Sequence, residues 1–270
     1  MSFFAKVSSK DNYDIHELDI FTEKYDMCDV ACLLTSIEVE IMLSKIKLSA
    51  SGCDEIPAWL LRQCSYELAV IVSYIINCSV ISGKVPSYWL NALVTPVPKV
   101  SKPTGFSDYC PISVTPLISR LTERIIVQRW ILLSVPPDML RDQYAFKPTG
   151  STTAALIYFM HQVTKLLEEN NYVRCLLIDF SKAFDKVDLI ILVQKLKTLD
   201  LPANVINWIC SFLTGHSQQC GVNGHLSEAI SIGLSVVQGS GIGPMLYAIM
   251  KSDLHTMSKM TTIFTERQLS

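Results

Sequence analysis

Three aspartates stand close together in the stretch Leu176–Asp188, which reads LLIDFSKAFDKVD. Asp179 comes directly after an apolar run of strand length, and Asp185 and Asp188 lie on the polar segment behind it. An ionised carboxylate is costly to bury, so a carboxylate at the end of a buried strand reaches a cleft, accepts hydrogen bonds or holds a cation. Two interpretations of Asp179 remain open at this point: a metal-binding carboxylate, or a cap for the turn into the next helix.

A glycine-rich stretch, Gln238–Pro244 with the sequence QGSGIGP, is the second candidate for chemistry. It is not a phosphate loop, because it lacks the Gly-Lys-Ser/Thr ending and does not match G-x-G-x-x-G. Its glycines would let the backbone approach a ligand closely, and Gln238 offers an amide. The alternative is a connector that leads into a helix with Pro244 near its first turn.

Composition limits the class of protein that could carry these residues. The 270 residues are 49% hydrophobic and 18% charged, which excludes a disordered chain and indicates one large or two modest packed domains. The nine cysteines form no C-x-x-C pair, so zinc and a disulfide framework are not expected. No apolar run suggests a membrane span, and a soluble intracellular protein is expected. The net charge of −2 means that any nucleic-acid surface must be local.

The periodic elements that position these residues are mostly helical. Thr35 and Glu38 have the spacing of a capping box, so a helix is expected to begin there. Asp188 is expected to cap a later helix, because it directly precedes an apolar-periodic run. Further helices are predicted over residues 58–83 (as one or two), 116–133, 152–169, 188–199 and 202–212.

Strand signals are few. Residues 172–180 read as a central strand that is covered on both faces, and Asn223-Gly224 marks a hairpin turn between two strands. Residues 95–105 are rich in proline, which predicts an extended segment with Lys99 and Lys102 exposed. Many helices with few strands indicate an α+β fold rather than a βαβ repeat.

Four blocks in order carry a family resemblance: SDYCPISVTPLISRLTERII, DQYAFKPTGSTTAAL, LLIDFSKAFDKVD and VVQGSGIGPMLY. Together they resemble the reverse transcriptase domain of LINE-type, non-LTR retrotransposons, from roughly Thr35 to Met260. The resemblance implies a right-hand polymerase fold that is helix-rich with a small antiparallel palm sheet and no thumb. It divides the chain into a poorly specified leader (1–34), a fingers-like helical region (35–170), a partial palm (171–260) and a divergent tail (261–270).

The resemblance also implies roles for individual residues around the transferred nucleotide. Asp179 falls on the catalytic metal-binding carboxylate, and the backbone carbonyl of Phe180 is a second oxygen ligand for the metal. Phe184 falls on the bulky steric gate that disfavours a 2′-hydroxyl on the incoming sugar. Gln238 and Gly239 fall on the pair that positions the nucleotide.

Cations of the fingers are implied to contact the triphosphate and the template. Lys99, Lys102 and Lys147 are the candidates for this role. Arg120 and Arg124 are weaker candidates, since a solvated helix face explains them equally well.

Three positions depart from the family pattern. Cys110 stands where the family has an arginine before the PIS sequence, so a guanidinium suited to phosphate oxygens is replaced by a thiol, and nucleotide affinity is expected to fall. Val237 replaces a proline and Leu189 replaces a histidine, which are milder changes.

The family also supplies an adjacent pair of aspartates on a hairpin that follows an SDL sequence, present here as Ser252-Asp253-Leu254. No Asp-Asp pair occurs in the 270 residues, and neither Asp253 nor Glu266 is a convincing replacement. A two-metal scheme needs more than one carboxylate. We therefore expect a fragment truncated before that hairpin, inactive alone, with weak or absent binding of Mg²⁺ or Mn²⁺.

The implied activity is RNA-directed DNA polymerase, a nucleotidyl transfer that uses an RNA template, a DNA primer and dNTPs, with no membrane partner. Two alternatives remain open. One is a non-catalytic module that binds nucleic acid, and the other is a relic without a selected function. Family members act in the nucleus or the cytoplasm, and no basic run of five residues assigns a compartment here.

Overall fold

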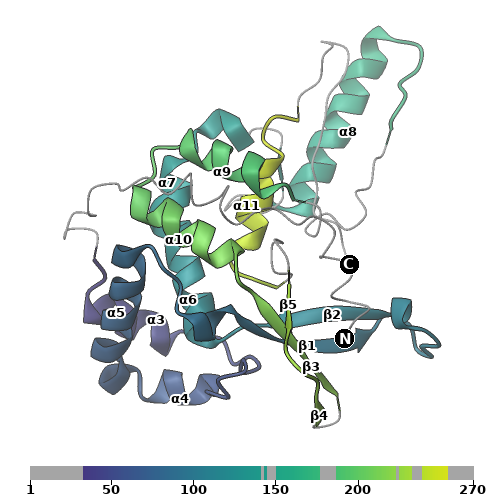
Figure 1. The fold of residues 1–270 in the computed structure, drawn as a ribbon. Helices are drawn as coiled ribbons and strands as arrows, with labels where there is room; N and C mark the ends of the chain where they lie inside the picture. The colour runs from purple at the N-terminus through teal and green to yellow at the C-terminus, as the bar shows by residue number, and fades with distance from the viewer. Residues whose placement is uncertain are drawn as a thin grey trace.

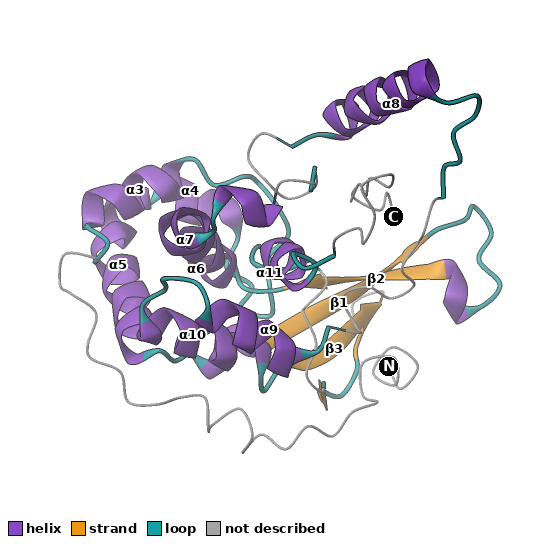
Figure 2. Cartoon of the chain, turned by 90° about the horizontal axis from the view of Figure 1, so that it is seen from above, coloured by secondary structure: helices purple, strands orange, loops and turns teal. Residues whose placement is uncertain are grey.

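The computed structural model describes residues 33–140, 143–144, 150–176, 187–222, 225–232 and 239–254. Most helices gather on one side of the molecule and a small sheet lies on the other (Figures 1 and 2). Helix α8 (Thr152–Glu169) projects away from both in the two views, and Ala155 is its one buried residue. The core that positions the candidate site therefore lies among the other helices.

Three helices form the N-terminal part of this core. Helix α3 (Ser36–Ser44) begins at the predicted capping box, in which Thr35 and Glu38 bond each other's backbone amides. Residues 58–83 form two helices, α4 (Ala58–Gln63) and α5 (Ser65–Ser82).

The length and composition of α5 would allow it to cross a membrane. It nevertheless buries Val72, Ile76 and Val80 in the same hydrophobic core as residues of α3 and of α10 (Ala203–Leu213). Only 33% of this helix is buried, and Val70, Ile71 and Tyr74 are exposed, so contacts with the core account for one face of the helix alone.

Residues 117–134 form one continuous helical rod with an irregular centre. Helix α6 (Leu117–Ile126) passes into a π-helical turn (Val127–Ile131) and a last turn, α7 (Leu132–Ser134). Helices α9 (Leu189–Lys197), α10 and α11 (Gly243–Met250) complete the core. Short 3₁₀ turns occur at Ser87–Leu90, Phe106–Asp108 and Pro137–Leu140.

Aromatic side chains fix the packing of α10 against α5. Trp208 stacks on Phe212 with ring centroids 5.5 Å apart, and both rings are fully buried. The indole N–H of Trp208 donates to Ser79 Oγ on α5 at 2.9 Å, so its polar atom is satisfied inside the core.

The sheet contains β1 (Asn91–Pro98), β2 (Tyr109–Val114), β3 (Ser217–Val222), β4 (His225–Leu226) and β5 (Ile230–Ser231). Its order is β2-β1-β3-β4, and β5 also pairs with β3. The expectation of an antiparallel sheet was wrong for one pair, since β1 and β3 run parallel. The chain between them includes several helices, and such a long crossover lets the strand return in the same direction.

The proline-rich segment is a strand, not merely extended. Pro96 of β1 pairs with Pro111 of β2 in a regular antiparallel ladder. Proline lacks an N–H, but β3 pairs with β1 only over Asn91–Val94, so Pro96 lies beyond the part of β1 that has a second neighbour. Lys99 and Lys102 are exposed, as predicted.

We expected a buried strand over residues 172–180, but the part of this segment that the structure describes is not a strand. Residues 172–176 have no regular secondary structure, and Tyr172 and Leu176 are 69% and 85% exposed. A strand needs a neighbour for its backbone groups, and no described strand pairs with this segment. The remaining residues, 177–180, lie outside the described ranges.

Candidate functional site

Five of the predicted site residues lie outside the described ranges: Asp179, Phe180, Phe184, Lys147 and Gln238. Three lie within them, namely Lys99, Lys102 and Gly239. The structure therefore describes the geometry of the predicted site only around these three residues.

Gly239 lies directly against strand β2. Its φ is +105°, a conformation that side chains disfavour, and a Cβ added there would lie 2.7 Å from the carbonyl oxygen of Ser113. The glycine thus allows a close approach of two backbones within the protein. The loop that carries the predicted nucleotide-positioning pair is held at this edge of the sheet.

A buried carboxylate holds the same loop from the other side. Glu123 of α6 accepts hydrogen bonds at Oε2 from the amides of Gly241 (2.6 Å) and Ile242 (3.3 Å). Its Oε1 accepts a bond from the hydroxyl of Ser119 at 3.2 Å, and Ser240 Oγ accepts one from the amide of Gly243 at 3.0 Å. The amides of Gly241 and Ile242, just before α11, and of Gly243, its first residue, are thereby satisfied, which fixes the start of that helix.

Glu123 is fully buried, and burial raises its pKa to about 7. The hydrogen bonds from Ile242, Gly241 and Ser119, and the positive charge of Arg120, act in the opposite direction and favour the ionised form. The sequence did not single out Glu123. The sequence offers one signal for its role: Glu123 lies four residues after Ser119, so both side chains are on one helix face. The structure buries both residues.

The two exposed lysines lie at the tip of the β1–β2 hairpin. Asp108 organises this tip: its Oδ2 accepts bonds from the amides of Thr104 (2.8 Å) and Gly105 (3.0 Å), and its carbonyl accepts one from the amide of Lys99 (2.7 Å). A charged, ordered loop of this kind can present ammonium groups to an anionic ligand.

Cys110 lies near the hairpin tip, two residues after Asp108, which binds the amide of Lys99. Cys110 pairs with Val97 across the ladder, and Lys99 directly follows the end of β1, where its amide donates to the carbonyl of Asp108. The thiol of Cys110 is half-buried. An arginine at position 110 would therefore add a cation close to the turn that carries Lys99.

The hairpin tip and the described part of the glycine-rich loop, from Gly239 on, lie apart. Gly239 contacts Ser113, and Asp108 at the tip is five residues away along the strand direction. At about 3.4 Å per residue, this is roughly 17 Å. Lys99 and Gly239 consequently belong to two ends of one surface, not to a single cluster.

The two arginines of α6 differ from each other. Arg124 is exposed, which agrees with a solvated helix face. Arg120 is half-buried and donates to Ala50 O at 2.6 Å and to Ser49 Oγ at 3.3 Å. The solvated-face interpretation was wrong for Arg120, because its guanidinium ties the segment after α3 to α6.

Two other aspartates have structural partners. Asp188 Oδ1 caps α9, as predicted, by accepting bonds from Ile190 N (2.9 Å) and Ile191 N (3.2 Å). Asp253 forms an ion pair with Lys195 at 2.6 Å, which ties the residues after α11 to α9. Among the described residues, no three His, Cys, Asp or Glu side chains lie together in a way that could hold a metal ion.

Residues 97–264 match the family model described as reverse transcriptase (RNA-dependent DNA polymerase). The chain belongs to the reverse transcriptase family. The matched range contains the hairpin tip, Cys110, the Glu123 carboxylate and the glycine-rich loop, so the geometry described above is that of a reverse transcriptase domain with the polymerase fold.

The relatives of this reverse transcriptase domain come from non-LTR retrotransposons. It is 27% identical over 236 residues to the RNA-directed DNA polymerase from mobile element jockey of Drosophila melanogaster, covering 86% of this chain and 26% of the relative. It is 25% identical over 240 residues to the probable RNA-directed DNA polymerase from transposon X-element of the same species, covering 88% and 25%.

A third relative is the Pol polyprotein from type-1 retrotransposable element R2 of Popillia japonica, which is 21% identical over 218 residues and is covered over 30% of its length. The chain spans about a quarter of the length of the first relatives that it matches.

Proposed function

We propose that this reverse transcriptase domain supplies the fingers and part of the palm for RNA-templated DNA synthesis, the addition of dNTPs to a DNA primer. The observation that carries the proposal is the family match over residues 97–264, which spans the lysine-bearing hairpin and the loop anchored by Glu123. The boundary between fingers and palm is proposed near residue 170, where α8 ends.

In this proposal, each element has its own role in binding the nucleotide. The loop at Gly239 supports Gln238 against the nucleotide, and its anchorage on both β2 and α6 keeps that support rigid. Lys99 and Lys102 hold phosphate groups at the hairpin tip, and Phe184 selects a deoxyribose. A rigid support of this kind favours catalysis because the reacting groups are positioned in advance.

Divalent metal ions are general in this family, but the described residues do not fit a metal site. Asp179 is proposed as a metal ligand from the sequence alone. The 270 residues contain no Asp-Asp pair, so we propose that the polypeptide 1–270 does not polymerise by itself.

Primer extension tests this function. One sample is the polypeptide 1–270 with an RNA template, a DNA primer, dNTPs and either Mg²⁺ or Mn²⁺. The second is a fusion in which residues 1–254 are followed by the segment that comes next in the jockey relative, including its carboxylates. We expect no extension by the first polypeptide and extension by the fusion.

Two outcomes would contradict the proposal. Extension by the polypeptide 1–270 alone would show that its own carboxylates suffice. A folded fusion that binds primer and template but never extends the primer would show that residues 1–254 do not supply a working half of the site. A fusion with Asp200→Asn, an aspartate before α10 to which no role is assigned, is the control.

A further inference from the structure

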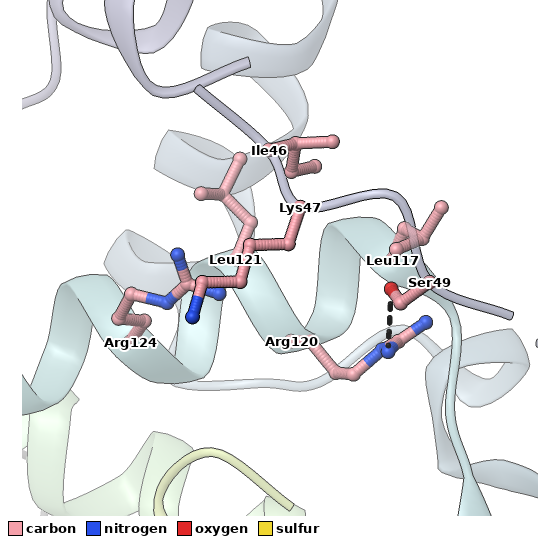
Figure 3. Close-up of a pocket in the computed structure, with 7 residues that line it drawn as sticks. All are labelled: Ile46, Lys47, Ser49, Leu117, Arg120, Leu121 and Arg124. Carbon is pink, nitrogen blue, oxygen red and sulfur yellow. Dashed lines mark hydrogen bonds between the residues drawn. The ribbon is translucent and has the colours of Figure 1, made fainter. Parts of the chain in front are cut away.

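A hollow lies between α6 and the segment that follows α3, on the surface of the helical part of the molecule (Figure 3). Its empty volume is about 290 Å³, open to solvent. The lining residues are Ile46, Lys47, Ser49, Leu117, Arg120, Leu121 and Arg124. Three of the seven are cations and none is an acid, in a chain whose net charge is −2.

The cations come from two separate elements. Arg120 and Arg124 are four residues apart on α6, so they project from the same side of the helix. Lys47 comes from the segment after α3, and its side chain and that of Arg124 both line the hollow (Figure 3).

Two of these cations are unpaired within the described structure. Lys47 and Arg124 form no hydrogen bond or ion pair with any described residue. Arg120 is held by Ser49 and Ala50, and its Nε is buried without a hydrogen-bond partner. The charges of Arg120 and Arg124 repel each other, and an anion bound in the hollow that they line together with Lys47 would offset this repulsion.

The nearest acids compensate this charge only in part. Asp54 and Glu123 both interact with the charge of Arg120, and burial raises the pKa of each carboxyl. Both oxygens of Glu123 already accept hydrogen bonds from Ser119, Gly241 and Ile242. The hollow therefore keeps an excess of positive charge at neutral pH.

We propose that this hollow binds a phosphate group, with Lys47 and Arg124 as the free cations and Arg120 as the fixed one. Guanidinium groups donate paired hydrogen bonds to phosphate oxygens, and a lysine adds a mobile charge. Ser49 Oγ accepts its bond from Arg120, which leaves the hydroxyl hydrogen available to a phosphate oxygen.

The phosphate has two possible sources with the same chemistry, a phosphodiester of a nucleic-acid strand or free inorganic phosphate. The hollow is distinct from the hairpin tip and from the glycine-rich loop, since none of its lining residues belongs to either. The proposal does not depend on polymerase activity, and it can be tested on the polypeptide 1–270.

The test compares two double variants with equal changes in charge. Lys47→Gln with Arg124→Gln removes the free cations of the hollow. Lys45→Gln with Arg62→Gln is the matched control, because both residues are exposed and neither lines the hollow. All four side chains are exposed, so folding is expected to be unchanged, and thermal unfolding checks this. A third protein, Arg124→Lys, retains the charge.

Binding of inorganic phosphate is measured by calorimetry, and binding of a short single-stranded RNA by fluorescence anisotropy at several salt concentrations. We expect the hollow variant to lose phosphate binding and the control to keep it. For RNA, we expect a loss of roughly tenfold relative to the control and a salt slope smaller by about 0.7, since the hollow binds one phosphate and each neutralised phosphate of a single strand contributes about 0.7. Arg124→Lys should keep most of the binding.

The results separate the two sources. Loss of both ligands supports a phosphodiester of nucleic acid, and loss of inorganic phosphate alone supports the free anion. The proposal is overturned if the hollow variant binds both ligands as the wild type does. It is also overturned if the two double variants weaken equally, because the effect would then belong to the overall charge.

Discussion

The Oε2 atom of Glu123 lies 2.6 Å from the backbone nitrogen of Gly241. This hydrogen bond joins the middle of α6 to the glycine-rich loop, although the two residues are far apart in the sequence. Gly239, two residues earlier, lies against the backbone of β2. The loop that we propose to lie beside the nucleotide is thus held by a core helix and by a strand, which leaves it little freedom.

The first prediction concerns the pH dependence of stability. The pKa of Glu123 is raised by burial from 4.5 to about 7 in the folded protein. A raised pKa means that the folded state binds the proton more tightly, so this contribution to stability is present below pH 4.5 and is lost as the pH rises through about 7. In Glu123→Gln, this loss is absent.

Chemical unfolding of both proteins between pH 4.5 and 8 measures the effect. We expect the stability of Glu123→Gln relative to the wild type to rise by roughly 3 kcal/mol over this range, at about 1.4 kcal/mol per pKa unit. Glu38→Gln is the control, because Glu38 lies at the surface and its pKa is lowered by its bonds to Thr35. Parallel curves for Glu123→Gln and the wild type would contradict the prediction.

A second prediction concerns Gly239. Substitution by alanine places a Cβ 2.7 Å from Ser113 O and forces an unfavourable φ of +105°, so we expect a loss of about 1–3 kcal/mol in the free energy of unfolding. Gly241→Ala is the matched control in the same loop, since its Cβ would meet neighbours at 3.5 Å. Equal stability of the two variants, measured by urea denaturation, would contradict the prediction, because the loop would then accommodate the added Cβ without a loss in the free energy of unfolding.

A third prediction concerns Cys110. Replacing it with arginine adds a guanidinium near the hairpin tip that carries Lys99, and we expect the affinity for a dNTP to increase roughly tenfold. The measurement is equilibrium titration with a fluorescent dNTP. Ile112→Arg adds the same charge two residues along β2 and serves as the control. If both variants bind equally tightly, position 110 has no special relation to the phosphates.

A fourth prediction concerns the cap of α9. Asp188→Ala leaves the amides of Ile190 and Ile191 without their acceptor, and we expect a loss of about 1 kcal/mol in stability. Thermal unfolding of Asp188→Ala beside Asp200→Ala provides the comparison. A midpoint for Asp188→Ala that equals the wild-type value would mean that water replaces the cap fully.

Local signals in the sequence predicted the helices well. The capping box at Thr35, the cap at Asp188 and the start of a helix after Pro202 were all confirmed, because each depends on neighbouring residues alone. The hairpin at Asn223-Gly224 was supported by its flanking strands β3 and β4, which pair as expected, and the two turn residues lie outside the described ranges.

Features that depend on distant partners could not be predicted in the same way. The β1–β2 ladder was missed because its prolines argue against a strand, and they are tolerated only where β1 lacks a second neighbour. The parallel pairing of β1 with β3 depends on how the intervening helices pack. The structural role of Glu123 could not be predicted from the sequence, because its partners, Gly241 and Ile242, lie more than 100 residues further along the chain.

The central claim is that residues 1–254 provide the template-reading half of a reverse transcriptase whose metal ligand is Asp179. The most direct measurement is single-nucleotide incorporation by the fusion protein on RNA templates that differ in one base, beside the same fusion with Asp179→Asn. We predict incorporation of the complementary dNTP in each case and its loss in Asp179→Asn. Incorporation that ignores the template base, or that survives in Asp179→Asn, would contradict the claim.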